Sequence, residues 1–360
     1  MKVLYLINYA GNGGSEKYVE LLLQAYHPGR CECGLCYNID GPLVEDARAM
    51  GVPVFQLTMK NPFDLAAAKK LARLCREEGF DVIHAQYPRE NYIAILAGLF
   101  GSRARVVFTS HLTIFQPFFW RPMNWIMTPH DHRIIALCKE GAAVLATNWV
   151  NKRRTTIIYN GVDASTMPPR DRSVLAEFGI GEDEKVLTIL ARFAPEKGLP
   201  FLCRTIARLK EKTQAPFRVL IAGQGEQMEE IRQLIQSLGL TGTVLLPGFR
   251  TDSDRLLAAS DIYLCSSAYN EAMSYAILEA MANHLPVAAT DVGGNRTLVE
   301  LDGQAGIIVP YGDVEGYSDA IQSLLEDADL RQRLGEAAYQ KTLGVFSLGY
   351  ILDRTFETYL

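Results

Sequence analysis

Two glutamates stand eight residues apart in the stretch SSAYNEAMSYAILEAMAN, which covers residues 266–283. On one helix, Glu271 and Glu279 would be separated by roughly 12 Å of rise. The acid and base that cleave one glycosidic bond lie within about 5–9.5 Å of each other. The spacing therefore disfavours a two-carboxylate hydrolase and favours one carboxylate at each end of an elongated ligand.

We expect Glu271 at or just before the start of a helix, where backbone N–H groups lack partners. The N–H groups of Ala272, Met273 and Ser274 would then bind sugar hydroxyls or phosphate oxygens. The plainer alternative is that Glu271 complements the helix dipole while Glu279 is solvated.

A second group of charges lies in the loop ARFAPEKG, residues 191–198, directly after an apolar run. This loop carries Arg192 and Lys197 just before a predicted helix. A guanidinium binds two oxygens at once and an ammonium acts as a mobile point charge, so the pair suits a diphosphate. The alternative is a solvated arginine beside a surface pair between Glu196 and Lys197.

Two glycine clusters also follow strand-like runs. In the first, GNGG from residue 11, the missing Cβ atoms of Gly13 and Gly14 would let an anionic ligand approach the backbone. Neither this cluster nor GQG at 223–225 completes the G-x-G-x-x-G dinucleotide pattern, because Glu16 and Met228 occupy the third glycine position. A nicotinamide cofactor is not expected, and a tight strand-to-helix turn is the alternative at each place.

Short apolar runs alternate with longer amphipathic stretches, as in repeated β-α units around a parallel sheet. In the first half, strands are predicted at residues 3–7, 33–37, 54–57, 82–84, 106–109, 134–137 and 156–158. In the second half, they are predicted at residues 186–190, 218–222, 244–246, 262–265, 287–290 and 306–309. Helices are predicted between them, for example at 16–25, with Ser15 as its cap, and at 65–78. Three helices are expected after residue 314.

The turn-rich stretch YNGVDASTMPPR, residues 159–170, separates the two series of strands. We therefore predict an N-terminal domain at 1–165, a second domain at 166–345, and a C-terminal helix at 346–360 that returns to the first domain. Doubly wound α/β domains bind ligands at the carboxyl ends of their strands. We expect the charged loops to line a cleft at those ends.

The composition excludes several classes of protein. Hydrophobic residues make up 48% and charged residues 21%, as in an ordinary folded protein. Lys and Arg total 36 against 41 Asp and Glu, a net charge of −5 that disfavours a nucleic-acid partner. No run reaches the about 18 apolar residues of a membrane-spanning helix. Seven scattered cysteines favour a reduced, cytoplasmic protein, and Cys31, Cys33 and Cys36 are interpreted as structural thiols rather than zinc ligands.

The motifs also carry a family resemblance. NEAMSYAILEAMA, residues 270–282, resembles the E-x7-E motif of retaining nucleotide-sugar glycosyltransferases of family 4, which have the GT-B fold of two Rossmann-like domains. Four further segments are similar in order and spacing: GGSE at 13–16, IYNGVD at 158–163, the loop at 192–198, and VGG at 292–294 with Glu300. The resemblance spans essentially the whole chain.

The resemblance implies a role for each candidate residue. Arg192 and Lys197 would bind the donor diphosphate and stabilise the negative charge that develops on it. Glu279 would accept hydrogen bonds from the ribose, and Glu271 would bind the transferred sugar near its anomeric carbon. His111, directly after a predicted strand, matches a family histidine that faces the donor sugar. The alternative for His111 is a hydrogen-bonded histidine at a strand end.

The same resemblance implies that Gly13, Gly14 and the backbone of residues 272–274 complete the donor site. Ala272 replaces the family's common glycine, and Met273 and Ser274 replace its Phe-Gly, so this loop is bulkier. Retention without a carboxylate nucleophile implies same-face substitution, in which the leaving phosphate helps to deprotonate the acceptor. No cofactor and no metal are expected, because the sequence has no HExxH motif and no Asp-x-Asp pair directly after a strand.

The segment LTIFQPFFWRPMNWIM, residues 112–127, combines three phenylalanines, two tryptophans and one arginine beside His111. It fits ordinary helical core, the wall of a pocket for a lipid-linked acceptor, or an interfacial membrane contact. The sequence leaves all three interpretations open.

The sequence therefore predicts a cytoplasmic, retaining glycosyltransferase, peripheral at the inner face of the membrane if residues 112–127 make that contact. It would transfer a sugar from a nucleoside-diphosphate donor to a glycan, lipid-linked or small-molecule acceptor, in the synthesis of polysaccharides or glycoconjugates. A nucleotide-sugar epimerase of the same fold and a non-catalytic partner subunit that only binds the nucleotide sugar are the alternatives.

Overall fold

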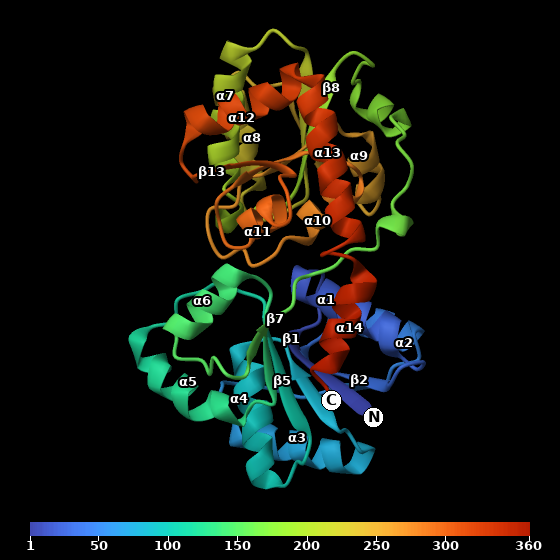
Figure 1. Ribbon diagram of the computed structural model, residues 1–360, viewed down its shortest axis with the longest axis vertical. Helices are drawn as coiled ribbons and strands as arrows, with labels where there is room; N and C mark the ends of the chain where they lie inside the picture. The colour runs from blue at the N-terminus through green and yellow to red at the C-terminus, as the bar shows by residue number, and fades with distance from the viewer. The chain divides into compact units, whose positions relative to one another are not determined.

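The computed structural model describes all 360 residues and divides them into two compact units. Met1–Asn160 and Ile351–Leu360 form the first unit, and Gly161–Tyr350 form the second. The sequence placed these boundaries at 165 and 345. Figure 1 shows that each unit is a sheet with helices packed on its faces. No helix combines the length and the apolar character that crossing a bilayer requires.

The first unit is built on a seven-stranded parallel sheet of order β3-β2-β1-β4-β5-β6-β7. Its strands are β1 (Lys2–Tyr9), β2 (Glu32–Ile39), β3 (Val54–Gln56), β4 (Val82–Ala85), β5 (Arg105–Ser110), β6 (Arg133–Ala136) and β7 (Thr155–Ile157). Its helices are α1 (Gly14–Tyr26), α2 (Pro42–Ala49), α3 (Leu65–Glu78), α4 (Pro88–Ala97), α5 (Arg121–Met127) and α6 (Lys139–Thr147), together with most of α14 (Leu348–Glu357).

The second unit has a six-stranded parallel sheet of order β10-β9-β8-β11-β12-β13. Its strands are β8 (Lys185–Leu190), β9 (Phe217–Ala222), β10 (Val244–Gly248), β11 (Ile262–Cys265), β12 (Val287–Thr290) and β13 (Gly306–Val309). Its helices are α7 (Leu199–Lys212), α8 (Met228–Ser237), α9 (Ser253–Ala259), α10 (Tyr275–Ala282), α11 (Asn295–Glu300), α12 (Val314–Glu326) and α13 (Ala328–Leu343). The predicted α/β fold with two Rossmann-like sheets is confirmed, and every predicted strand is present.

The local sequence explains where the helices begin. At α3, the Asp64 carboxylate accepts from the N–H of Ala67, and Gly79 ends the helix in the left-handed conformation. The prediction that Ser15 caps the first helix is wrong, because α1 already begins at Gly14. Ser15 Oγ instead donates to Glu16 Oε2 at 2.7 Å, inside the first turn.

The C-terminal residues close the first unit, as predicted for a bracing helix (Figure 1). Tyr359 is fully buried, and its hydroxyl lies 2.8 Å from Nδ1 of His84 on β4. The Tyr26 hydroxyl of α1 donates to the Leu352 carbonyl at 2.5 Å. These contacts hold α14 and the residues after it against α1 and β4.

The segment 112–127 is not ordinary core, so that interpretation of it is wrong. Phe115, Phe118, Phe119 and Trp125 are each 65–70% exposed. Only Asn124 and Met127 on α5 are buried. One of these two buried residues, Asn124, is polar, which the aromatic composition alone did not indicate.

All seven cysteines are buried and none forms a disulfide. The sulfurs of Cys31 and Cys33 lie 3.8 Å apart. Cys36 is buried in a separate cluster with Leu4 and Leu6. This alternation along the strand agrees with the interpretation of the three residues as structural thiols.

Candidate functional site

The chain order of the second sheet reverses between its neighbouring strands β8 and β11. In open α/β sheets, ligands bind at such a switch point, beyond the carboxyl ends of the strands. The loop with Arg192 and Lys197 follows β8, and the loop with Glu271 follows β11. The fold therefore brings the two charged motifs of the sequence to one edge of one sheet.

Lys197 and Glu271 form an ion pair across these two loops. Lys197 Nζ lies 2.7 Å from Glu271 Oε2, and the side chains are 26% and 12% exposed. Ser267 Oγ donates to the same carboxylate oxygen at 2.8 Å. Burial alone would lower the pKa of Lys197, but the attraction of Glu271 outweighs it and the pKa is raised. The lysine is therefore a cation that already sits in a partly dry site.

Arg192 makes a different contact. Its guanidinium pairs with Glu196, four residues later, and its side chain is 70% exposed. The surface pair between Glu196 and Lys197 that the sequence left open does not form, because each residue has another partner. An exposed pair of this kind contributes only about 0–1 kcal/mol. Arg192 can therefore exchange Glu196 for an incoming anion at little cost.

Backbone contacts hold the two loops together. The N–H of Ala268 donates to the Glu196 carbonyl at 2.7 Å, and Ser266 Oγ donates to the Lys197 carbonyl at 2.8 Å. Gly198 has φ +61°, and a Cβ there would lie 2.2 Å from the Ser266 carbonyl oxygen. Only glycine fits this approach. The sequence reasoning missed Ser266 and Ser267, although both directly follow a predicted strand.

The position predicted for Glu271 needs correction. Helix α10 begins at Tyr275 with Ser274 as its cap, so Glu271 lies in the preceding loop and does not share a helix with Glu279. The N–H groups of Ala272 and Met273 likewise precede the helix. The estimate of helical rise does not apply to this pair, and the argument that it gave against a two-carboxylate site fails.

The turn at residues 292–294 packs closely against the backbone of the loop that carries Glu271. Gly293 has φ +56°, and a Cβ there would lie 1.5 Å from the Glu271 carbonyl oxygen. The N–H of Gly294 donates to the carbonyl of Ala272 at 2.9 Å. The VGG motif at 292–294 therefore positions Glu271 by close backbone contact, which any side chain at Gly293 would prevent.

Glu279 lies half-buried on α10, and both glutamates act on one tyrosine. Burial, then Cys265, then the carboxylates of Glu279 and Glu271 raise the pKa of Tyr263. Tyr263 belongs to β11 and is fully buried. The Leu190 N–H, at the end of β8, donates to the Tyr263 hydroxyl at 3.4 Å, a contact that the sequence did not indicate.

The first sheet has a matching switch point between β1 and β4. The glycine cluster follows β1, but the Glu16 carboxylate folds over it: Glu16 Oε2 lies 2.6 Å from where a Cβ of Gly13 would be. A hollow of about 160 Å³ beside it is lined by Glu16, Glu20 and Asp46, with Lys17 as the single cation. Because carboxylates outnumber cations around this hollow, its charge does not favour the predicted anion contact at Gly13 and Gly14.

His111 follows β5 in the same unit and belongs to a neutral cluster. Its Nε2 lies 2.8 Å from Gln86 Oε1, and Gln86 Nε2 donates to the His84 carbonyl at 3.0 Å. This amide orientation makes His111 Nε2 the donor and leaves Nδ1 as the unprotonated nitrogen. Burial lowers the pKa of His111 to about 3, so the ring is neutral at ordinary pH. Rings of Tyr18 and Tyr87 pack 5.1 and 5.8 Å from it.

No group of three or more His, Cys, Asp or Glu side chains is placed to hold a metal ion. The expectation that no metal is needed remains a prediction.

Known families match both units. Residues 12–166 match Glycosyltransferase Family 4, and residues 172–341 match Glycosyl transferases group 1. The chain is 30% identical over 304 residues to N-acetyl-alpha-D-glucosaminyl L-malate synthase of Bacillus anthracis, which covers 82% of this chain and 78% of that protein. The chain belongs to the group 1 glycosyltransferases of family 4 type.

A further relative and two solved structures are similar over most of the chain. The Escherichia coli UDP-Gal:alpha-D-GlcNAc-diphosphoundecaprenol alpha-1,3-galactosyltransferase is 24% identical over 337 residues, 89% of this chain and 86% of its own. Anabaena HepE, solved in complex with UDP and glucose, has a TM-score of 0.85 at 23% identity, with 99% of both chains covered. Sucrose-phosphate synthase of Thermosynechococcus elongatus has a TM-score of 0.81 at 18% identity, with 100% of this chain and 98% of that chain covered. These structures confirm the predicted GT-B fold.

Proposed function

We propose that this glycosyltransferase transfers a sugar with retention of configuration from a nucleoside-diphosphate sugar to a glycan, lipid-linked or small-molecule acceptor. The observation that carries the proposal is the Lys197–Glu271 pair with Ser267 at the switch point of the second sheet. A partly buried cation beside a carboxylate offers one partner for a phosphate and one for a sugar hydroxyl.

The diphosphate would bind by an exchange of partners. Lys197 would turn from Glu271 to the phosphate next to the sugar, and Arg192 would leave Glu196 for the same diphosphate. The released Glu271 carboxylate would then accept hydrogen bonds from hydroxyls of the transferred sugar. Glu279, half-buried on α10, would accept from the ribose. In the free protein, each of the two cations is thus paired with a carboxylate until the donor binds.

The proposed reaction takes place on one face of the sugar. The bond from the anomeric carbon to the phosphate oxygen breaks, and its electron pair leaves with the diphosphate. The acceptor oxygen forms the new bond from the same side, and its proton passes to the leaving phosphate. Lys197 and Arg192 stabilise the charge that grows on that phosphate, which lowers the barrier without any protein nucleophile. No metal is required in this scheme.

His111 is proposed to contact a substrate hydroxyl. Its neutral ring, with Nε2 held by Gln86, offers a lone pair at Nδ1 that can accept a hydrogen bond. Glu16 stands over Gly13, so a contact of Gly13 or Gly14 with the donor would involve its hydroxyl groups rather than its phosphates.

A uridine donor and a membrane-proximal place of action are part of the proposal. The Escherichia coli relative is named for UDP-Gal and a diphosphoundecaprenol acceptor, and Anabaena HepE was solved with UDP. We propose the cytoplasm as the location, with the inner face of the membrane as the place where a lipid-linked acceptor is met.

The donor is tested first by thermal shift. The protein is heated with UDP-glucose, UDP-galactose, UDP-N-acetylglucosamine and GDP-mannose, and the true donor raises the melting temperature because it binds the native state. Glu271→Gln should retain the shift with the free nucleotide and lose turnover by about two to three orders of magnitude. Near-wild-type turnover in this variant would end the assignment of Glu271.

Product analysis separates the proposal from its alternatives. The protein is incubated with its donor and EDTA, with and without an acceptor panel, and products are followed by NMR. A product with the donor's own anomeric configuration, formed in EDTA, supports a retaining and metal-independent transfer. An isomerised sugar from the donor alone would indicate an epimerase, and donor binding without turnover would indicate a non-catalytic subunit.

A further inference from the structure

Several large apolar side chains of residues 112–127 are exposed, whereas a polar residue between them is buried. Phe118 and Phe119 are 68% and 70% exposed, and Trp125 on α5 is 68% exposed. Asn124, the residue before Trp125, is only 2% exposed. In a surface helix that faces water the opposite arrangement is normal. The exposed rings are therefore not part of the core, because other residues of the segment, Asn124 and Met127, already pack against the unit.

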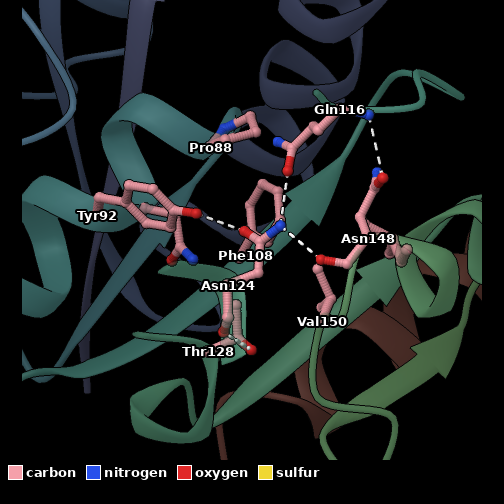
Figure 2. A pocket seen from close by; sticks show the side chains of 10 residues that line it. Pro88, Tyr92, Phe108, Gln116, Asn124, Thr128, Asn148 and Val150 are labelled. Carbon is pink, nitrogen blue, oxygen red and sulfur yellow. Dashed lines mark hydrogen bonds between the residues drawn. The ribbon is translucent and has the colours of Figure 1, made fainter. Parts of the chain in front are cut away.

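A buried amide network holds this inverted segment in place (Figure 2). Asn124 Nδ2 donates to Gln116 Oε1 at 2.6 Å and to the carbonyl of Asn148 at 2.7 Å, while Asn124 Oδ1 accepts from the Tyr92 hydroxyl. Asn148 Nδ2 in turn donates to the carbonyl of Ile114 at 2.9 Å. Because buried amides need their partners, the network fixes which side of the segment faces outward.

Several of the exposed rings contact one another or Trp120. Phe118 packs 6.3 Å from Trp149, and Phe119 and Phe63 pack 5.8 and 5.9 Å from Trp120. Trp149 has φ 62°, the left-handed region in which a bulky side chain is rare. We call Phe63, Phe115, Phe118, Phe119, Trp125 and Trp149 the aromatic surface. Trp120, Trp125 and Trp149 are all the tryptophans of the chain.

Basic side chains accompany this surface in an otherwise acidic protein. Residues 101–154 contain eight Lys or Arg against two Asp or Glu, whereas the whole chain carries 36 against 41. Arg121 lies over the Phe118 ring, 5.6 Å from its centroid. Lys152 and Arg153, close to Trp149 in the chain, are exposed. One of the two acids, Asp131, is buried. The charge that accompanies the rings is therefore positive.

We propose that the aromatic surface docks this protein onto an anionic phospholipid bilayer as a peripheral contact. Rings of Trp and Phe occupy the interface between headgroups and acyl chains, and nearby Lys and Arg side chains attract anionic headgroups. The positive charge selects this occupant over an uncharged apolar partner. The amide network keeps the rings exposed before contact, so docking requires no refolding of the segment.

Tryptophan emission tests the docking directly, because all three tryptophans lie in the segment or on the surface. The full-length protein is mixed with vesicles of phosphatidylcholine alone or with about 30 mol% phosphatidylglycerol. We expect a blue shift, quenching by brominated lipid, and co-flotation with the anionic vesicles only. Absence of binding to anionic vesicles would overturn the proposal.

Variants separate the aromatic surface from general stickiness. Phe118→Ala with Phe119→Ala should lower the vesicle partition coefficient by about tenfold or more and leave the melting temperature near wild type, because both rings are exposed. Phe249→Ala, at another exposed phenylalanine in the second unit (57%), should bind like wild type. Equal binding by all three proteins would contradict the proposal.

Charge and self-association are tested in the same way. Lys152→Glu with Arg153→Glu should weaken binding to anionic vesicles by about tenfold. Arg232→Glu with Arg255→Glu, a matched change of charge in the second unit, should not. Sedimentation is the last readout: a wild-type dimer that becomes monomeric in the Phe118/Phe119 double variant, without vesicle binding, would show that a second copy covers the surface and would overturn the proposal.

Discussion

The two sheets share one strand order around their switch points and differ in what their loops place there. Beyond β8 and β11, the second unit places two ion pairs, Lys197–Glu271 and Arg192–Glu196. Beyond β4 and β5, the first unit places a neutral histidine held by an amide, with tyrosine rings around it. Equal topology thus supports two chemistries, because loops rather than strands supply the side chains.

The contrast leads us to expect different ligands in the two units. A partly buried lysine beside an exposed arginine suits a diphosphate, whereas neutral rings and amides suit hydroxyl groups. Salt and pH should therefore act on the two units differently, and each of the following experiments tests one side of this contrast.

The largest effect is expected from Lys197→Ala. Loss of the cation that we propose to face the leaving phosphate should lower turnover about a thousandfold, equivalent to about 4 kcal/mol of transition-state stabilisation. Steady-state kinetics with the donor found by thermal shift measure this loss. Lys212→Ala, which removes another paired lysine of the same unit, serves as the control and should remain active. A fully active Lys197→Ala enzyme would remove the charged site from the contrast.

The second effect concerns stability of the first unit. Glu90 on α4 is fully buried, both its carboxylate oxygens lack partners, and burial raises its pKa to about 7. The pKa of Glu90 is higher in the folded protein than in the unfolded chain. Its burial therefore costs little stability below pH 4.5, and the folded state loses stability as the pH rises from 4.5 through about 7. Glu90→Gln should therefore raise the free energy of unfolding by about 3 kcal/mol at pH 8.5 and hardly at all at pH 4.5.

Urea unfolding at both pH values measures the effect of Glu90→Gln, and Glu45→Gln on exposed α2 is the control. An equal change at both pH values would mean that folding does not raise the pKa of Glu90 and that its carboxylate is not desolvated in solution. In that case the first unit would not be the neutral one.

Arg192→Ala should act mainly on donor binding. Its exposed pair with Glu196 contributes little to folding, so the melting temperature should stay near wild type. The KM for the donor should rise about thirtyfold, or about 2 kcal/mol, and donor binding by the wild-type enzyme should weaken as salt is raised. If neither Arg192→Ala nor added salt weakened donor binding, the diphosphate would not bind at Arg192.

The smallest effect is expected from Gln86→Leu in the first unit. Without its Oε1, the proton of His111 is no longer held on Nε2, and kcat/KM should fall about tenfold while UDP binding stays unchanged. Gln24→Leu on α1 is an exposed control. Because the pKa of His111 is about 3, the wild-type rate should show no inflection from this ring between pH 5 and 9, and an inflection near pH 6.5 would contradict the neutral cluster.

The strands were predictable because buried parallel strands carry their signal locally, as short apolar runs between turns. The same is true of α3, because its capping residue Asp64 and its terminal glycine Gly79 directly flank the helix in the sequence. Predictions failed where the deciding contact was not local. Ser15 resembles a cap, yet its hydroxyl bonds to Glu16 and lies 2.7 Å from the Tyr87 hydroxyl, 72 residues away.

The candidate site shows the same division. Residue types and the family resemblance made Arg192, Lys197, Glu271, Glu279 and His111 candidates, because a motif is a property of the chain. Partners were not predictable, since Lys197 and Glu271 are 74 residues apart and meet only after β8 and β11 pair. The need for glycine at Gly293 likewise arises only when its turn packs beneath Glu271.

The sequence by itself determined the fold class, the strands and the chemical groups available, because apolar period, turn residues and charge are written in neighbouring positions. Only the tertiary structure decided which cation pairs with which carboxylate, that Glu271 precedes its helix, and that the aromatic segment turns its rings outward. These outcomes depend on contacts between residues distant in the chain, where burial and close approach select one arrangement among those that the local pattern allows.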